Sequence, residues 1–382
     1  MSLTGFIYVL TSCCASILYI VSLGHGVILG TTNKSQFIKM DLNKIIFLMM
    51  LCVPMFVGAQ TLTFTDHEPM GNMRTQVTRQ FFRLVEQESK GRIRIDHHWN
   101  GELSSSYDAY ETVREGTKAD MATVVPEYDS QRMPLHQLFK SFLAGPSGEA
   151  QVALIRKAYK TIPELTEELH HAGIHPVLVA TGYPVGFYSR EPMADLSALK
   201  EQTWRTASFW HISYLENAGA TNKRIPWGEQ VSDSLRSGAI DGIMVNIDSG
   251  WDIGAHRAAP HLLVSQELWL GHIYLVAMNL DRWNALPPKD KRAIERAASK
   301  TYKAMGKTMD ESYEQMLQQL SNEGCTVRRL THEEVSDFVT NVRQSEVQER
   351  WVKEKESEGT ADVRRVFEKL RSLVQHSAKR KQ

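Results

Sequence analysis

The chain has 382 residues, which is enough for two ordinary domains with buried cores. Lys plus Arg and Asp plus Glu both number 44, so the formal net charge is zero, and 42% of the residues are hydrophobic. This balance argues against a nucleic-acid partner, which normally requires a basic excess or a basic stripe.

Two apolar runs begin the chain, Gly5–Gly30 without any Lys, Arg, Asp or Glu, and Lys44–Gln60. The second run has the parts of a secretory signal, because a basic start precedes its apolar stretch and small residues precede Gln60. We therefore predict a signal peptide at residues 40–59, the true start at Met40, and an upstream extension at residues 1–39. The alternative for the first run is a transmembrane helix, since it is long enough to span a bilayer.

Cysteine usage fits an exported protein without disulfides. Cys13, Cys14 and Cys52 precede the predicted cleavage position, and only Cys325 follows it. A single cysteine excludes an internal disulfide and a CxxC metal site in the mature chain. We predict that Cys325 is a small buried apolar residue.

The first part of the mature chain alternates between strand and helix patterns. Period-two alternation predicts strands at Thr61–His67 and Ile93–Trp99, and helical spacing predicts a helix at Asn72–Ser89 between them, ended by Gly91. A further helix leads to a short buried strand at Met121–Val125. Such a βαβαβ order is typical of a mostly parallel sheet.

The α/β pattern continues, and the chain then becomes nearly all helix from Trp283 onward. Later strands are predicted at His175–Tyr183, Val185–Met193 and Ile273–Asn279, with a short one around Trp204. We predict crossings between two lobes near Gly182 and Gly271. Lobe I would contain residues 60–182 and about 271–310, and lobe II residues 183–270 and about 311–382. A cleft between two such lobes suits hinge closure around a ligand.

Catalytic signatures are missing from the sequence. It has no GxSxG nucleophile elbow, no GxxxxGK[ST] phosphate loop, no GxGxxG and no HExxH motif. We therefore predict that the protein is not an enzyme and uses no metal and no cofactor.

Arg205 is the residue that most suggests a binding site, because it follows a short apolar approach and tryptophans surround it in the sequence. Arginine stays protonated in proteins, and its planar fork of donors grips a carboxylate by two parallel hydrogen bonds. The alternative is an internal salt bridge or a surface arginine.

Two segments carry a family resemblance, "ADLSALKEQTWR" and "LENAGATNKRIPWGEQVSDSLRSGAIDGIMVN". Together with "FFRLVEQESKGRIRIDHHWNGEL", "VREGTKADMA" and "DRWNALPPKDKRAI", in this order, they resemble the DctP-type solute receptors of TRAP transporters. The resemblance runs from about Thr61 to Ala297. It implies a type II-like two-lobed α/β fold with a hinge, a central cleft and a long helix across both lobes.

The resemblance also implies a function without catalysis. The protein would be a periplasmic receptor that binds an organic acid, without a cofactor, and delivers it to the TRAP membrane permease. Arg205 matches the carboxylate-gripping arginine of the family, and Asn246 matches an asparagine that often reaches the same ligand. Trp210 and Trp227 flank these positions, and His67 would face the cleft from the other lobe. A core role for either tryptophan is equally open.

One departure from the family concerns the ligand. Relatives that bind dicarboxylates or sialic acid often carry a second arginine near the position of Val185, which is apolar here. Five tryptophans lie between Trp204 and Trp269, and indole faces suit sugar rings. We therefore favour a sugar acid or a similar monocarboxylate, and a monomeric receptor. A membrane-tethered sensor domain and a periplasmic enzyme on the same scaffold are the alternative functions.

Overall fold

The computed structural model describes residues 59–378, apart from 207, 226 and 270, and four short segments before residue 36. These segments are the strands β1 (Ile7–Leu10), β2 (Leu18–Leu23), β3 (Gly26–Thr31) and β4 (Lys34–Ser35), which form an antiparallel sheet in that order. The described parts of the first apolar run are thus strands, and not the helix considered as an alternative. The predicted signal peptide, except Ala59, lies outside the described residues. No helix in the described part of the chain is long and apolar enough to cross a membrane.

The unit that begins at Ala59 contains two sheets. The first has the order β6-β5-β7-β14-β8, with β5 parallel to β6 and β7, and β14 antiparallel to β7 and β8. Its strands are β5 (Gln60–Thr65), β6 (Ile93–His98), β7 (Met121–Val124), β8 (Ile174–Ala180) and β14 (Tyr274–Asn279).

The second sheet has the order β11-β10-β12-β9-β13-β15. Its strands are β9 (Val185–Ser189), β10 (Thr203–Arg205), β11 (Thr221–Lys223), β12 (Gly242–Asn246), β13 (His261–Val264) and β15 (Thr326–Arg329). The chain thus passes from the first sheet to the second between β8 and β9, and returns between β13 and β14. Strand β15 is the exception in the C-terminal part, which is otherwise largely helical as predicted, and it pairs in parallel with β13. The lobe boundaries stay a prediction.

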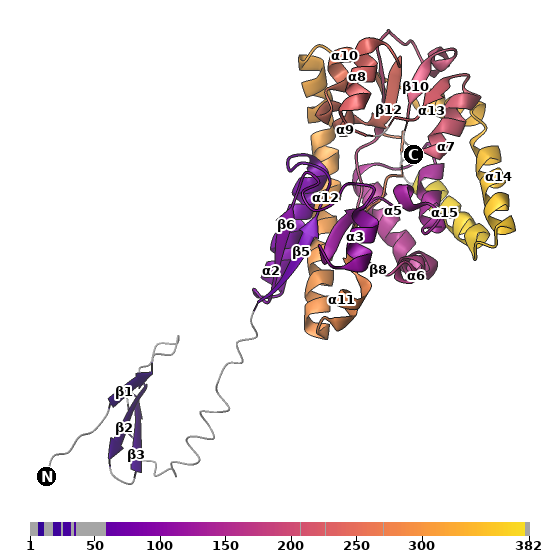
Figure 1. Ribbon diagram of the computed structural model, residues 1–382. Helices are drawn as coiled ribbons and strands as arrows, with labels where there is room; N and C mark the ends of the chain where they lie inside the picture. The colour runs from indigo at the N-terminus through magenta and orange to yellow at the C-terminus, as the bar shows by residue number, and fades with distance from the viewer. Residues whose placement is uncertain are drawn as a thin grey trace. The chain divides into compact units, whose positions relative to one another are not determined.

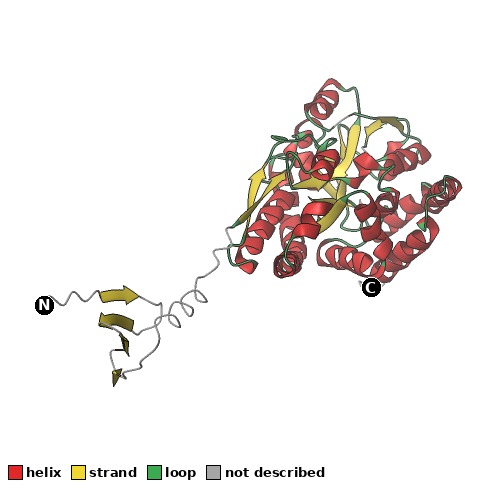
Figure 2. Cartoon of the chain, turned by 60° about the horizontal axis from the view of Figure 1, so that its bottom comes forward, coloured by secondary structure: helices red, strands yellow, loops and turns green. Residues whose placement is uncertain are grey.

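Helices enclose the strands of this unit (Figure 2). They are α2 (Met73–Glu88), α3 (Ala109–Glu115), α4 (Pro134–Gln137), α5 (Gly148–Thr161), α6 (Pro163–His171), α7 (Phe209–Asn217), α8 (Glu229–Ser237), α9 (Ile247–Asp252), α10 (Ala255–Ala258), α11 (Leu280–Ala285), α12 (Pro288–Asn322), α13 (His332–Asn341), α14 (Gln344–Ser357) and α15 (Val363–Ala378). Three short 3₁₀ turns are η1 (Pro126–Asp129), η2 (Leu138–Ser141) and η3 (Leu196–Leu199).

Helix α2 illustrates how the sequence determines these elements. The side chain of Asn72 accepts a hydrogen bond from the Thr75 amide and so caps the helix start, where backbone donors lack helical partners. Its apolar residues Val77, Phe81 and Val85 recur at helical spacing and are buried.

Helix α12 joins the two lobes. Its 35 residues span about 52 Å at the rise of an α-helix. Ile294, near its start, packs in the core of the first sheet, whereas Met309 and Leu320 pack in the core of the second. Figure 1 shows this helix, in orange, running from beside α2 and α11 to beside α9. The two-lobed α/β fold with a long helix across both lobes is confirmed.

Candidate functional site

A small cavity lies where the carboxyl ends of strands from both sheets meet. Its volume is about 50 Å³, and His67, Tyr128, Arg205, Trp227 and Asn246 are among its lining residues. The first two follow β5 and β7, which run parallel. Arg205 and Asn246 end β10 and β12, which also run parallel, and Trp227 follows the neighbouring parallel strand β11. Ligands of α/β proteins commonly bind at this edge, where strand ends leave a crevice. The fold thus gathers at the cavity four of the five residues predicted to bind the ligand.

Some of the N–H donors of the Arg205 guanidinium already have a hydrogen-bond partner in the protein. Its Nε and Nη2 atoms donate to the carbonyl oxygen of Ile225 at 3.1 and 3.0 Å, and its guanidinium carbon lies 5.2 Å from the centre of the Trp227 ring. The side chain is only 2% exposed, and no carboxylate lies within 4.0 Å of it in the described part of the chain. An N–H of Nη2 and both N–H groups of Nη1 therefore remain for a ligand.

Burial is the main influence on the protonation of Arg205. It lowers the pKa of this side chain, while the nearby Tyr128 and Glu127 act in the opposite direction. An arginine remains charged despite such a shift, because its reference pKa is so high. The site therefore contains a desolvated positive charge, which a carboxylate would stabilise strongly.

Asn246 lies at the end of β12 and is also buried. Its Nδ2 donates to the carbonyl oxygen of Tyr183, which fixes the amide and leaves one N–H of Nδ2 for another acceptor. Trp227 is half-buried and lies against Arg205, so its indole forms part of the cavity wall.

A second cation at the cavity is already paired. Lys140, on η2, forms an ion pair with Glu127, and both side chains are buried. Burial lowers the pKa of Lys140, and the charge of Glu127 and its hydrogen bond raise it. Because this pair is neutral overall, it adds no net positive charge to the cavity.

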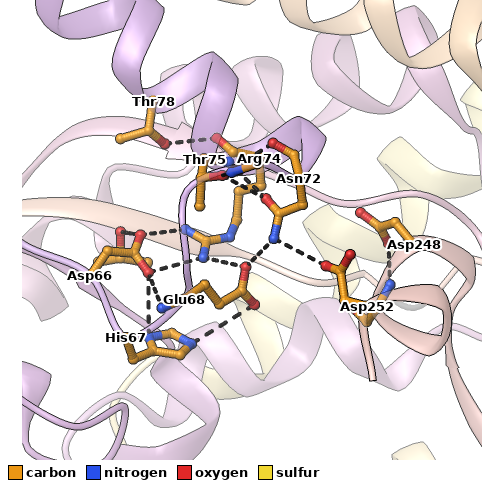
Figure 3. A network of polar contacts seen from close by, with 12 residues as sticks. Asp66, His67, Glu68, Asn72, Arg74, Thr75, Thr78, Asp248 and Asp252 are labelled. Carbon is orange, nitrogen blue, oxygen red and sulfur yellow. Dashed lines mark hydrogen bonds and ion pairs between the residues drawn. The ribbon is translucent and has the colours of Figure 1, made fainter. Parts of the chain in front are cut away.

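Arg74 positions the first-sheet side of the site (Figure 3). Its Nη1 lies 2.6 Å from Asp66 Oδ2, and its Nη2 lies 2.6 Å from Glu68 Oε2. These contacts hold the two carboxylates on either side of His67, whose Nδ1 is 3.7 Å from Asp66 Oδ1. Burial lowers the pKa of His67, as does the charge of Arg74, whereas the two carboxylates raise it.

Trp210 is the exception among the predicted site residues. It is 1% exposed, its Nε1 donates to the carbonyl oxygen of Gln137 at 2.9 Å, and its ring packs 5.0 Å from that of Trp351. It does not line the cavity, so its prediction as a ligand contact is corrected to the alternative core role.

A larger groove of about 730 Å³ lies between α2, α9 and α12. It does not include Arg205, and none of the buried polar atoms that lack partners in the described residues belongs to its lining. The small cavity, by contrast, contains seven of twenty such atoms. Buried polar atoms normally have partners, so their concentration makes the smaller cavity the candidate binding site.

Comparison with known families identifies the chain. The model of the bacterial extracellular solute-binding proteins, family 7 (DctP), matches residues 64–353. The chain belongs to the DctP family. A comparison with curated proteins gives no match.

Solved structures of other DctP-type proteins share the fold. A TRAP solute-binding protein from Rhodoferax ferrireducens, in complex with benzoate, is 19% identical with a TM-score of 0.73 and covers 85% of this chain and 100% of its own. A Bordetella pertussis receptor that binds pyroglutamic acid is 21% identical (TM-score 0.65; 80% and 100% covered). A Sulfitobacter protein with bound β-D-galacturonate is 17% identical (TM-score 0.67; 81% and 99% covered). At these identities the likeness shows the fold alone.

Sequence reasoning missed several cavity residues of this DctP-family chain. Glu127 and Tyr128 lie on η1, the first element after β7, and polar residues after a buried parallel strand were the signal that could have found them. Lys140, within the apolar stretch of η2, gave no local signal. His211 and His272 also line the cavity. In the described residues, no group of three or more His, Cys, Asp or Glu side chains could hold a metal ion.

Proposed function

We propose that the protein is the extracytoplasmic solute receptor of a TRAP transporter, and that Arg205 binds the carboxylate of its ligand between the lobes. The observation that carries this proposal is the buried guanidinium of Arg205, which has free N–H groups and no carboxylate partner among the described residues. Its position at the end of β10 fits the arginine of the family. The ligand-bound, closed receptor would then be recognised by the membrane permease in the periplasm.

The charges at the cavity favour a ligand with one carboxylate. Lys140 is neutralised by Glu127, and the position near which a second arginine would be expected is the buried Val185. A second carboxylate would therefore be buried without a counter-charge, which is costly. Benzoate, pyroglutamic acid and galacturonate, the molecules named with the three similar structures, each have one carboxyl group. We propose a sugar acid or a similar monocarboxylate.

Three further residues complete the proposed site. The remaining N–H of Asn246 would donate to the carboxylate held by Arg205, and the Trp227 indole would cover an apolar face of the ligand. His67 would approach from the first sheet. Closure of the lobes would expel water and strengthen the ion pair.

Isothermal titration calorimetry with galacturonate, pyroglutamate, benzoate and succinate tests the clamp. Arg205→Ala should weaken binding of the preferred monocarboxylate by about 2–5 kcal/mol, because the carboxylate would be buried unpaired. Arg329→Ala is the matched control, since Arg329 is exposed and paired with Glu314 away from the cavity. Equal affinity of the wild type and Arg205→Ala for the same acid would refute the clamp.

Transport needs a separate test. Loss of the receptor from its native host should abolish uptake of the acid that the purified protein binds. Unchanged uptake would contradict the transport role while leaving the binding site intact.

A further inference from the structure

Two imidazoles at the cavity have no assigned role. His211 lies on α7, and His272 lies two residues before Tyr274, the first residue of β14; both line the cavity. Both ring nitrogens of each histidine are buried without a hydrogen-bond partner in the described part of the chain. His211 is completely buried, whereas His272 as a whole residue is half-buried although its ring nitrogens are buried. Polar atoms buried in this way destabilise a fold unless a ligand or water satisfies them.

Both histidines are neutral at physiological pH. Burial lowers the pKa of His211 to about 3, with a further contribution from the positive charge of Lys140, although the Lys140 backbone acts in the opposite direction. Burial also lowers the pKa of His272 well below its ordinary value, again with Lys140 contributing. A neutral imidazole presents one N–H donor and one nitrogen acceptor. Both rings can therefore hydrogen-bond an uncharged group but cannot balance a second negative charge.

The backbone holds His272 beside the segment that contains Lys140. Gly271 has a φ of 60°, and a Cβ placed on it would lie 2.0 Å from the carbonyl oxygen of Phe139. Only glycine permits so close an approach. The ring of His272 stacks on that of Tyr274, with the ring centres 4.2 Å apart and the planes 7° apart, which fixes its orientation.

Helix α7 is attached to the same segment, and this attachment fixes His211. Trp210 donates to the carbonyl oxygen of Gln137 at 2.9 Å, and Tyr214 donates to that of Ser141 at 2.7 Å. The two donor residues lie one position before and three positions after His211 in the helix. The two imidazoles are therefore held against the segment 137–141, which contains Lys140. We call the wall that these three residues form the imidazole wall (His211, His272 and Lys140).

We propose that His211 and His272 recognise an uncharged hydrogen-bonding group, such as a hydroxyl or a lactam amide, on the same ligand whose carboxylate Arg205 binds. This inference rests on the proposed function and deepens it. A hydroxyl or an amide can both donate and accept, which matches two rings that each offer a donor and an acceptor. A site built to hydrogen-bond such a group discriminates against an analogue that lacks it, because its own polar atoms would stay unpaired.

Three monocarboxylates separate this inference from simple carboxylate binding. Galacturonate offers hydroxyl groups, pyroglutamate offers a lactam, and benzoate offers no polar group beyond its carboxylate. We expect the wild type to bind at least one of the first two more tightly than benzoate in calorimetry. His272→Phe and His211→Phe should each weaken binding of that polar acid by about tenfold or more. They should change the affinity for benzoate by less than about threefold.

His256→Phe is a matched control. His256 is also buried with both ring nitrogens unpaired in the described residues, but its ring stacks on Trp251 and it does not line the cavity. It should leave the affinity for all three acids unchanged. If a Phe variant does not fold, as judged by circular dichroism, the Gln and Leu variants of His272 replace it. His272→Gln should retain more of the preference for the polar acid over benzoate than His272→Leu, because the glutamine amide can both donate and accept hydrogen bonds.

The outcomes separate the two proposals. If Arg205→Ala loses binding while the His211 and His272 variants keep the wild-type preference, the imidazole wall is not a recognition surface and the carboxylate clamp stands. If the His211 and His272 variants lost as much affinity for benzoate as for the polar acid, the inference would also be overturned. If the wild type binds no monocarboxylate, the proposed ligand class fails and this inference fails with it.

Discussion

Asp248 provides the sharpest prediction about stability, because it is a nearly buried carboxyl group without a cationic partner among the described residues. It lies on α9, is 7% exposed, and accepts a hydrogen bond from the Ser249 amide at 2.9 Å. Burial, together with the charges of Asp252 and Glu68, raises its pKa from 3.8 to about 7. Figure 3 shows it beside Asp252, whose Oδ2 lies 3.4 Å from Asn72 Nδ2 across the lobes.

The sign of the pH dependence follows from this shift. The folded protein holds the proton on Asp248 up to about pH 7, whereas the unfolded chain loses it near pH 4. The unfolded state therefore binds fewer protons between these values, and the free energy of unfolding falls as pH rises through this window. The shift corresponds to roughly 4 kcal/mol above pH 8, at about 1.4 kcal/mol per pKa unit.

Asp248→Asn removes this effect and keeps the acceptor for the Ser249 amide. We expect the variant and the wild type to have similar free energies of unfolding in urea near pH 4, and the variant to be more stable by up to roughly 4 kcal/mol at pH 8. Urea titrations at pH 4, 6 and 8, monitored by tryptophan fluorescence, measure the difference. A difference between the two proteins that stays constant from pH 4 to pH 8 would refute the reasoning.

Two further predictions concern buried groups. Arg74→Met should reduce the free energy of unfolding by about 3–5 kcal/mol, because Asp66 would stay buried without its partner. Arg236→Ala, which breaks an exposed ion pair on α8, should lower the free energy of unfolding by less than about 1 kcal/mol. Urea titrations that give equal losses for the two variants would contradict the argument. Burial raises the pKa of Cys325 to about 11, so a thiol reagent at pH 8 should modify it only after unfolding. Peptide mapping by mass spectrometry measures this, and rapid labelling of the native protein would refute it.

The sequence was sufficient for features that depend on local pattern. Period-two alternation predicted β5, β6 and β14 to within two residues of their observed ends, and the family segments predicted the DctP fold. Arg205 and Asn246 were predicted as ligand contacts from their match to family positions, and His67 from its place after the first strand. All three line the cavity.

Features that depend on contacts between distant segments could not be foreseen. The indole of Trp210 donates to Gln137, 73 residues earlier, and no local pattern distinguishes this core contact from a ligand contact. Strand β15 is short and pairs with β13, about 65 residues earlier in the chain, between regions of strong helical pattern. The pairing of Lys140 with Glu127 likewise depends on how η1 and η2 fold together.

The same long-range contacts explain why closure of the lobes should depend on the ligand. Arg205 is desolvated at the cavity, and in the described residues its side chain donates hydrogen bonds to the Ile225 carbonyl oxygen. The cross-lobe hydrogen bond from Asn72 to Asp252 is 3.4 Å long, which is at the weak end of such bonds. A carboxylate placed at Arg205 supplies a counter-charge where water is excluded, so it stabilises the closed form more than the open one. We therefore propose that ligand binding and closure are coupled through the guanidinium of Arg205.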